Sequence, residues 1–329
     1  MESHQHDMKM YGDIKLYGGS GSPDLAQKIA DYLEQKLSPR EVIQFPNENI
    51  FIKLNSSTRG QDVYVIQTTS SPVHYNLMEL LIMIQTIRLD SAARITAVVP
   101  YLCYGRSDKK DQPRVPITAR LVADMLESAG ADRYMTFDPH AGQIQGFFSI
   151  PGDVLTAGHM ISDHIKEHLL ANMHEPVVVA TDLGFAKKGR NYALDLDVPI
   201  AFIEKRRSGN DAKAEALTLI GDVNGRDVII VDDEVDTGGS IVQAVNVVKN
   251  NGARDVYLAF IHPIFSRNAT ERLAALPIKH IITTDTVAIP EAKMEPLKGR
   301  VTILSVAPML GEVIRRAHEG RSVGEMFNE

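Results

Sequence analysis

The stretch that decides the fold is VIIVDDEVDTGGS, residues 228–240. Its apolar, β-branched run predicts a buried strand, and this strand ends in two acids, Asp232 and Asp233. Two glycines, Gly238 and Gly239, follow where a helical pattern begins, and glycine lets the backbone come close to a bound group. The stretch therefore predicts a strand, a loop at the carboxyl end of that strand, and a helix.

Strand and helix patterns alternate on both sides of this stretch. The predicted helices cover residues 73–90, 117–130 and 239–251. The predicted strands cover residues 62–67, 94–100, 177–181, 198–204, 227–233 and 255–262. Because these strands are nearly continuous apolar runs, they are expected to be buried on both faces, as in a parallel sheet covered by helices. The fold class predicted is therefore α/β.

An internal repeat indicates two copies of one α/β unit. The segment RGQDVYVIQTTSSP (59–72) resembles GRDVIIVDDEVDTGG (225–239), and each precedes a predicted helix of similar length. Gly60 lies 165 residues before Gly225, and Arg94 lies 160 residues before Arg254. This nearly constant offset predicts tandem domains, although any two βαβ units share some likeness. The first domain is expected to span residues 1–153 and the second residues 154–329.

Composition excludes several classes of protein. The 329 residues include 35 Lys and Arg and 42 Asp and Glu, for a net charge of −7. A mildly acidic chain is a poor candidate for a nucleic-acid binder. The most apolar helical pattern, residues 77–87, is too short to cross a membrane. With the single cysteine Cys103 and no apolar core of a signal peptide, a cytoplasmic protein that handles a small molecule is expected.

The loop after the strand at 227–233 has the chemistry of a phosphate site. Amides at a helix start and the helix dipole favour an anion, and Thr237 and Ser240 add hydroxyl donors. The acids Asp232 and Asp233 could accept hydrogen bonds from sugar hydroxyls or hold Mg²⁺. A phosphate at one end and hydroxyls at the other describe a pentose phosphate. The alternative is an acidic turn with an Asp helix cap and no ligand.

This loop resembles the ribose-phosphate signature of the phosphoribosyltransferase superfamily. Five further segments make the chain similar to the ribose-phosphate pyrophosphokinase family from about Ile14 to Phe327. These are TFDPHAGQIQGFF (136–148), FIEKRRSGN (202–210), YLCYGRSDKKDQPRVPITARLVADML (101–126), NLMELLIMI (76–84) and HPIFS (262–266). The resemblance implies two tandem phosphoribosyltransferase-like (Rossmann-like) domains, each a mostly parallel sheet flanked by helices. It also implies transfer of the β,γ-pyrophosphoryl group of MgATP to the anomeric hydroxyl of ribose 5-phosphate, with release of AMP.

The resemblance assigns roles residue by residue. The positions that match the family's ribose 5-phosphate loop are Asp232, Asp233, Asp236, Thr237, Gly238, Gly239 and Ser240. The positions that match its ATP site are Phe45, Asn47, Asn49, Arg106, Ser107, Lys109 and His140. His140 and Asp182 match positions that bind Mg²⁺, and Lys205 and Arg207 match the cations of its catalytic loop, expected here after a strand that ends at 204.

The chain also departs from the family pattern. Asn47 and Asn49 stand where members commonly have acids, Ser107 where many have Gln, and Lys109 where many have Arg. Asn can still form hydrogen bonds but carries no charge. Lys carries a compact point charge, whereas the planar guanidinium of Arg can donate two parallel hydrogen bonds. These substitutions indicate a divergent branch that retains Asp232, His140 and the other catalytic positions.

The family resemblance implies self-association, and it leaves other functions open. Its members form dimers, commonly stacked into hexamers, with an ATP site shared between subunits, and neither nucleic acid nor membrane is expected as a partner. Three other functions remain open at this point. They are a phosphoribosyltransferase that consumes the activated sugar, a non-catalytic regulatory subunit, and a pyrophosphokinase for another sugar phosphate. The sequence leaves regulation and oligomer size undecided.

Overall fold

The computed structural model describes residues 11–182, 184–207 and 215–327, which form two compact units. The first unit takes the chain as far as Leu155 and again from Ala307, and the second takes Thr156–Val306. The domain prediction differs from this division because it placed everything after residue 153 in the second domain. The C-terminal helix instead packs in the first unit, against a helix that lies near the N-terminus.

The first unit is built on a parallel sheet of five strands within the described residues, in the order β1-β4-β5-β6-β7. Its strands are β1 (Ile14–Gly18), β4 (Asp62–Ile66), β5 (Arg94–Val98), β6 (Arg133–Phe137) and β7 (Gly152–Leu155). A separate antiparallel hairpin joins β2 (Arg40–Gln44) and β3 (Ile50–Leu54). Its helices are α1 (Pro23–Tyr32), α2 (Val73–Leu89), α3 (Thr118–Ala129) and α9 (Ala307–Glu319).

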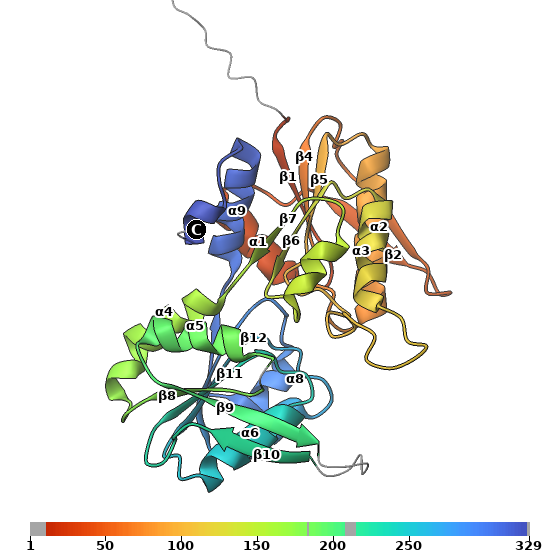
Figure 1. Ribbon diagram of the computed structural model, residues 1–329. Coiled ribbons are helices and arrows are strands. Elements are labelled where there is room, and N and C mark those ends of the chain that lie inside the picture. The colour runs from red at the N-terminus through yellow and green to blue at the C-terminus, as the bar shows by residue number, and fades with distance from the viewer. Residues whose placement is uncertain (1–10, 183, 208–214, 328–329) are drawn as a thin grey trace, which may run out of the picture. The chain divides into compact units, whose positions relative to one another are not determined.

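Helices cover both faces of this sheet. In Figure 1, α1 and α9 lie on one side of the strands, and α2 and α3 lie on the other. The hairpin packs on α2 through β3. The central strands β4 and β5 are buried along their whole length, as their continuous apolar sequences predict. The predicted α/β class and helix positions are confirmed here, with α2 and α3 within a residue or so of the predicted ranges.

The second unit has a larger sheet with one antiparallel edge strand. Within the described residues its order is β10-β9-β8-β11-β12-β13-β14, and only the β9–β10 pair is antiparallel. The strands are β8 (Val177–Ala180), β9 (Ile200–Arg207), β10 (Glu215–Ile220), β11 (Val228–Glu234), β12 (Val256–His262), β13 (Ile278–Thr284) and β14 (Val301–Leu304). The helices are α4 (Gly158–His168), α5 (Ala186–Leu196), α6 (Gly239–Asn250), α7 (Ala269–Ala274) and α8 (Glu291–Met294).

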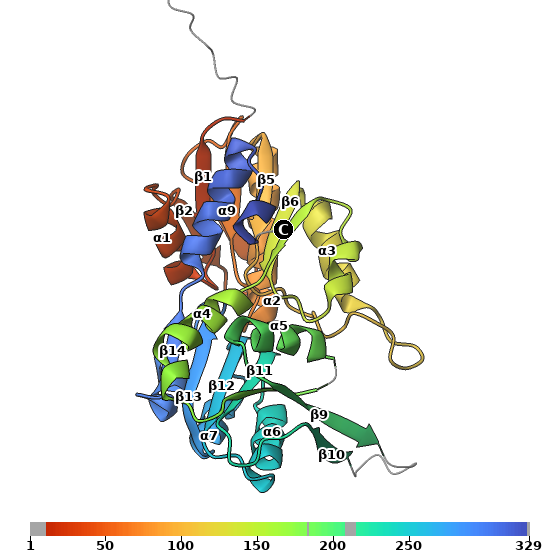
Figure 2. The same ribbon diagram turned by 60° about the vertical axis from the view of Figure 1, so that its left-hand side comes forward.

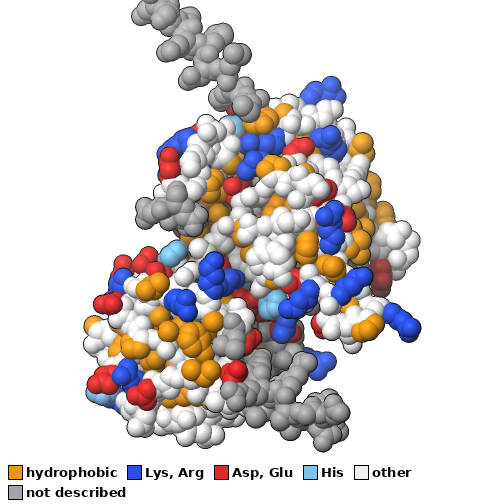
Figure 3. Space-filling view, viewed as in Figure 1, with side chains coloured by type: hydrophobic (Ala, Val, Ile, Leu, Met, Phe, Trp, Pro, Cys, Tyr) orange, Lys and Arg blue, Asp and Glu red, His pale blue; other side chains and the backbone are white. Residues whose placement is uncertain are grey.

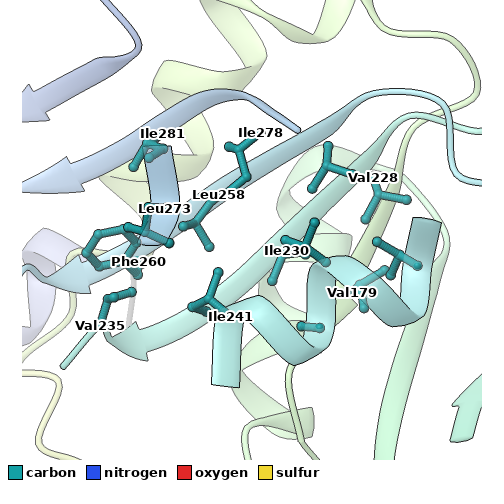
Figure 4. Packing of buried hydrophobic residues seen from close by; sticks show 14 of the residues in the cluster. Val179, Val228, Ile230, Val235, Ile241, Leu258, Phe260, Leu273, Ile278 and Ile281 are labelled. Atoms are coloured by element: carbon teal, nitrogen blue, oxygen red, sulfur yellow. The ribbon is translucent and has the colours of Figure 1, made fainter. Parts of the chain in front are cut away.

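The core of the second unit lies between its sheet and α6. Figure 2 shows α4 and α5 on one face of the strands and α6 and α7 on the other. In Figure 4, Ile241 of α6 lies against Ile230 of β11, with Leu258 and Phe260 of β12 beside them. All four side chains are buried. This apolar layer fixes the strand that carries the two acids and the helix that follows them.

The predicted internal repeat has a structural counterpart. Gly60 and Gly225 both have positive φ, 70° and 75°, in the turn before the first repeated strand. Just after these turns the buried acids Asp62 and Asp227 each pair with an arginine at the start of the next strand. The nitrogen–oxygen distances are 2.6 Å from Arg94 to Asp62 and 3.4 Å from Arg254 to Asp227. The two βαβ segments therefore share a turn and an ion pair to a buried acid as well as their strand order.

The end of α3 supplies a first testable expectation. Gly130 closes this helix with φ 113°, and an added Cβ would lie 2.9 Å from the Arg88 side chain. Gly130→Ala is therefore expected to lower the free energy of unfolding by about 1–2 kcal/mol, since an L-residue is strained at this φ. Urea denaturation would measure it. The control is Gly146→Ala, where an added Cβ meets open space, and an equal loss in both variants would contradict the expectation.

Candidate functional site

The loop between β11 and α6 is shaped by one glycine. Gly238 caps α6 with φ 75° and ψ 1°, a left-handed conformation that glycine adopts without a Cβ penalty. Its carbonyl accepts the first helical bond, from the amide of Val242, at 3.0 Å. The hydroxyl oxygen of Thr237 lies 3.7 Å from where a Cβ of Gly239 would stand. The loop thus places a side-chain hydroxyl beside the positive end of the helix dipole.

The back of this loop is held by the segment that follows β12. The amide of Phe265 donates to the carbonyl of Val235, and that of Ser266 to the carbonyl of Asp236, each at 2.9 Å. The Arg272 guanidinium donates to the carbonyl of Thr237 at 3.3 Å. Successive carbonyls of the loop are therefore bound by one neighbouring segment. HPIFS contributes to the family resemblance, but its residues give no local signal of this supporting role.

The two acids at the end of β11 lie in different hydrogen-bonding environments. Asp232 accepts a hydrogen bond from the Thr181 hydroxyl on one oxygen and from the Asp233 amide on the other, both at 2.9 Å. Asp233 is buried and accepts from the amide of Glu234 at 2.8 Å. Burial and the neighbouring charge of Asp233 raise the pKa of Asp232 well above that of an ordinary aspartate. An acid pair with one buried and one half-buried member is suited to a ligand that supplies hydroxyl donors or a cation.

Asp182 lies at the same edge of the second sheet. It follows β8, and β8 pairs in parallel with β11 so that Ala180 is opposite Val231. Asp182 is half-buried, and one of its oxygens accepts the amide of Phe185 at 2.8 Å. The hydrogen bond from Thr181 to Asp232 ties these two strand ends together. Thr181 was not among the predicted site residues, although it directly precedes Asp182 in the sequence.

In the first unit, the loop predicted to bind ATP lies next to the turn that carries His140. Residues 105–109 follow β5, and His140 follows β6, the neighbouring parallel strand. The backbone of Gly105 passes so close to His140 that an added Cβ would lie 3.4 Å from the histidine Cβ. The side chains of Asp108 and Gln143 are hydrogen-bonded across the same junction. The structure therefore brings Arg106, Ser107 and Lys109 next to the turn that carries His140.

The loop at 106–116 also encloses a surface pocket. Its volume is about 260 Å³, and Arg106, Ser107 and Lys109 contribute to its wall. The Ser107 hydroxyl bonds that of Thr118 at 3.2 Å at the start of α3. The Thr118 amide, the first of α3, also donates to the Ser107 hydroxyl oxygen at 3.4 Å, so the Ser107 side chain is engaged with the start of the helix.

The turn of the β2–β3 hairpin carries Phe45, Asn47 and Asn49. The Phe45 amide donates to the Asn49 carbonyl at 2.8 Å, and the Asn49 amide donates to the Asn47 side chain at 3.2 Å. Phe45 is 45% exposed, and its ring centroid lies 6.3 Å from that of Phe51. This exposure shows that Phe45 is not a core residue of the N-terminal unit. An exposed aromatic ring is available for stacking on a planar ligand.

Lys205 and Arg207 lie on a strand and not on the predicted loop. β9 continues to Arg207 because it pairs with β10, with Lys205 opposite Leu217 and Arg207 opposite Glu215. The predicted strand ended at 204 because polar residues follow. The observed strand continues beyond its pairing with β8, which reaches Phe202, and among the described residues its last positions pair only with β10. The rest of the predicted catalytic loop, residues 208–214, lies outside the described residues.

Surface charge, helix length and side-chain clustering bear on binding to nucleic acids, membranes and metal ions. On the face shown in Figure 3, Lys and Arg side chains are interspersed with Asp and Glu. Across the described part of the chain, no helix is long and apolar enough to span a membrane. Nor do the described residues contain a group of three or more His, Cys, Asp and Glu side chains that could hold a metal ion.

A parallel sheet that ends in an acid pair, a TGG turn and a helix start defines a phosphoribosyltransferase-like protein. Two family models match this chain. Residues 14–130 match the N-terminal domain of ribose phosphate pyrophosphokinase, and residues 208–328 match the phosphoribosyl synthetase-associated domain.

Curated relatives agree with these matches. The chain is 42% identical to the ribose-phosphate pyrophosphokinase of Aquifex aeolicus over 95% of this chain and 99% of that protein. It is 43% identical to that of Caldanaerobacter subterraneus over 95% and 98%. The crystal structure of phosphoribosylpyrophosphate synthetase from Mycobacterium smegmatis matches with a TM-score of 0.88 and 39% identity, covering 94% of this chain and 99% of that one. The chain belongs to the ribose-phosphate pyrophosphokinase family, and the predicted family, fold class and enzyme class are confirmed.

Proposed function

We propose that the chain synthesises 5-phosphoribosyl 1-pyrophosphate from MgATP and ribose 5-phosphate, for use in nucleotide biosynthesis. The anomeric hydroxyl oxygen attacks the β-phosphorus, the bond from that phosphorus to the α,β-bridging oxygen breaks, and AMP leaves while the hydroxyl proton is released. Such a transfer depends on positioning and on neutralising phosphate charge. The observation that carries the proposal is the Asp232–Asp233 pair beside the Gly238 cap at one strand end.

In the second unit, ribose 5-phosphate would bind along the loop after β11. The phosphate suits the start of α6, where the helix dipole and the Thr237 and Ser240 hydroxyls favour an anion. The ribose hydroxyls suit the carboxylates of Asp232 and Asp233, because an ionised carboxylate accepts several hydrogen bonds. The carbonyls bound by Phe265 and Ser266 hold the intervening backbone in place. Lys205 and Arg207 would supply positive charge to the transferred phosphoryl groups.

ATP would use two elements of the N-terminal unit, and the family resemblance implies that a second subunit supplies one of them, the turn of the β2–β3 hairpin. Arg106, Lys109 and His140 suit its phosphates, since they belong to loops that pack together at the ends of β5 and β6. The exposed ring of Phe45 suits adenine, with Asn47 and Asn49 beside it as neutral hydrogen-bonding groups. We assign ATP recognition to the N-terminal domain and ribose 5-phosphate recognition to the C-terminal one.

Mg²⁺ fits this scheme as a partner of the phosphates. Asp182 offers a half-buried carboxylate with one oxygen already bound to an amide, and His140 is exposed on its turn. Because the described residues hold no cluster of three or more protein ligands, the ion would take most of its ligands from phosphates and water, which is usual for Mg²⁺. When bound, it would neutralise phosphate charge and polarise the β-phosphorus.

Self-association and a cytoplasmic location complete the proposal. The β2–β3 hairpin exposes three large apolar side chains, Ile43, Phe45 and Phe51, each by more than 40%. Apolar groups gathered on a projecting hairpin support burial against a second subunit. We propose a dimer or hexamer on this basis, and we place the enzyme in the cytoplasm, where ATP and sugar phosphates are available.

Product analysis tests the reaction itself. Purified protein with MgATP and ribose 5-phosphate is expected to form AMP and phosphoribosyl pyrophosphate in equal amounts. Phosphorus NMR would measure both products. ADP as the nucleotide product would indicate transfer of a single phosphoryl group. No turnover of a folded protein would indicate a regulatory subunit, and turnover with another sugar phosphate alone would redirect the assignment of the acceptor.

Thr237→Val tests the phosphate loop. The valine keeps the side-chain shape beside Gly239 and removes one hydroxyl donor. We expect KM for ribose 5-phosphate to rise about tenfold, the equivalent of roughly 1.4 kcal/mol, while KM for ATP stays unchanged. Thr218→Val on exposed strand β10 is the matched control. A rise in KM for ATP alone would assign the loop to the other substrate.

A further inference from the structure

Two histidines lie one turn apart on α4. His164 and His168 are spaced i and i+4, so both project from the same side of the helix. Their ring centroids are 4.6 Å apart, with the ring planes tilted by 52°. Neither residue belongs to the substrate loops described above. Pairs of histidines at this spacing are a recognised way for a helix to bind a metal ion.

The separation of the rings matches what one shared metal ion requires. A zinc–imidazole bond is about 2.0–2.1 Å long, so the ring centroid lies about 3.2 Å from the metal. Two imidazoles bound at angles between 90° and 110° would then have centroids about 4.5–5.3 Å apart. The observed 4.6 Å falls within this range. The separation of the rings is therefore compatible with one shared ion.

The surroundings leave the rings available. The imidazole of His168 is 59% exposed and lies 3.7 Å from the Glu167 carboxylate. His164 is half-buried, and among the described residues no hydrogen bond to its ring is found.

His280 lies near this pair but is already engaged. Its Nε2 is 2.8 Å from the Thr302 hydroxyl on the adjacent strand β14, and burial lowers its pKa. The described residues include no three-ligand metal group. The two rings on α4 thus act as a pair, and water has to fill the remaining coordination positions.

We propose that His164 and His168 bind one late transition-metal cation, of which Zn²⁺ is the representative. Imidazole nitrogen is a good ligand for Zn²⁺, Ni²⁺ and Cu²⁺, whereas Mg²⁺ prefers oxygen ligands. The site is therefore separate in chemistry from the Mg²⁺ proposed for the reaction. Because the ion has only two protein ligands, and one of them is the exposed His168, it exchanges readily with solution.

Calorimetric titration with ZnCl₂ in excess Mg²⁺ tests this site. The parent should be the full chain carrying His4→Ala and His6→Ala, because these two N-terminal histidines could also bind the probe. We expect one Zn²⁺ equivalent whose affinity falls at least tenfold in His168→Ala. His159→Ala is the matched control, since His159 lies on the same helix and pairs with Asp195 at 2.8 Å.

A second readout identifies the ligands directly. With Cu²⁺ as the probe, the electron paramagnetic resonance spectrum should show coupling to two imidazole nitrogens in the parent and to fewer in His168→Ala. His164→Ala should act likewise, and the exposed His168 serves the test if loss of the half-buried ring disturbs folding. Unchanged Zn²⁺ affinity in His168→Ala, or an equal loss in His159→Ala, would overturn the proposal.

Discussion

The Asp232→Asn variant is expected to unfold at a higher temperature than the parent at pH 8, and to lose affinity for ribose 5-phosphate. Asn fits the site because its oxygen can accept the amide of Asp233 while its amide donates to the Thr181 hydroxyl, which can rotate to accept. The substitution removes one charge from a buried acid pair. It also removes a charged acceptor for the ribose hydroxyls, so KM for that substrate should rise about 10- to 100-fold.

The stability gain has a definite pH dependence. Burial and Asp233 raise the pKa of Asp232 in the folded chain, so a proton binds more tightly to the folded state than to the unfolded one. Below the unfolded pKa of about 3.9 both states are protonated, and Asn gives no electrostatic advantage. As the pH rises through the raised folded pKa, the parent must bury a negative charge and becomes less stable. The advantage of Asn should therefore grow with pH and then level off.

Thermal melts of both proteins across this pH range, together with substrate kinetics, measure the effect. Asp222→Asn is the control for lost charge, because that side chain is 73% exposed in the same unit. A melting temperature lowered equally at every pH would show that Asp232 contributes mainly through its hydrogen bonds. An unchanged KM for ribose 5-phosphate would remove Asp232 from the proposed sugar site.

Asp62→Ala is expected to have the largest effect on stability. Arg94 donates to both oxygens of this fully buried carboxylate, at 2.8 and 2.6 Å. The Tyr64 hydroxyl donates to it at 2.9 Å, and Nδ1 of His318 lies 2.8 Å from it. Without Asp62, a guanidinium that is only 10% exposed loses its counter-ion. We expect the free energy of unfolding to fall by about 3–5 kcal/mol.

A double-mutant cycle distinguishes the ion pair from loss of packing. Arg94→Met removes the other charge, so the double variant Asp62→Ala/Arg94→Met should lose less than the sum of the single variants. Urea denaturation followed by circular dichroism would provide the energies. Additive losses, or a loss below about 1 kcal/mol for Asp62→Ala, would mean that solvent replaces the carboxylate.

The central βαβ segments were predictable because local signals agree there. The apolar strand at 62–67, the helix at 73–90 and the closing Gly130 each follow from adjacent residues, and the structure places them within a residue or two. The order of strand, acids, glycines and helix at 228–240 likewise predicted where the candidate sugar loop lies, between β11 and α6. Patterns with a period of two or of 3.6 residues are contained in the sequence itself.

The remaining features depend on partners distant in sequence. Nothing near Arg207 reveals that β10 extends the strand that carries it. The supporting bonds from Phe265 and Ser266 join residues about thirty positions from the loop they hold. The packing of α9 on α1 joins the two ends of the described chain. Such contacts are decided by tertiary structure, which overrides local preference.

The return of α9 to the first unit has a consequence for how the chain emerges from the ribosome. The first strands appear early, but His318 and the Ala317 carbonyl that receives a bond from Arg94 are made only after the whole second unit. Until then, the acid–arginine pair of β4 and β5 lacks part of its surroundings. The second unit, continuous in sequence, can fold first as it leaves the ribosome. Completion of the N-terminal unit therefore follows synthesis of the second unit, which couples the maturation of the first unit to that of the second.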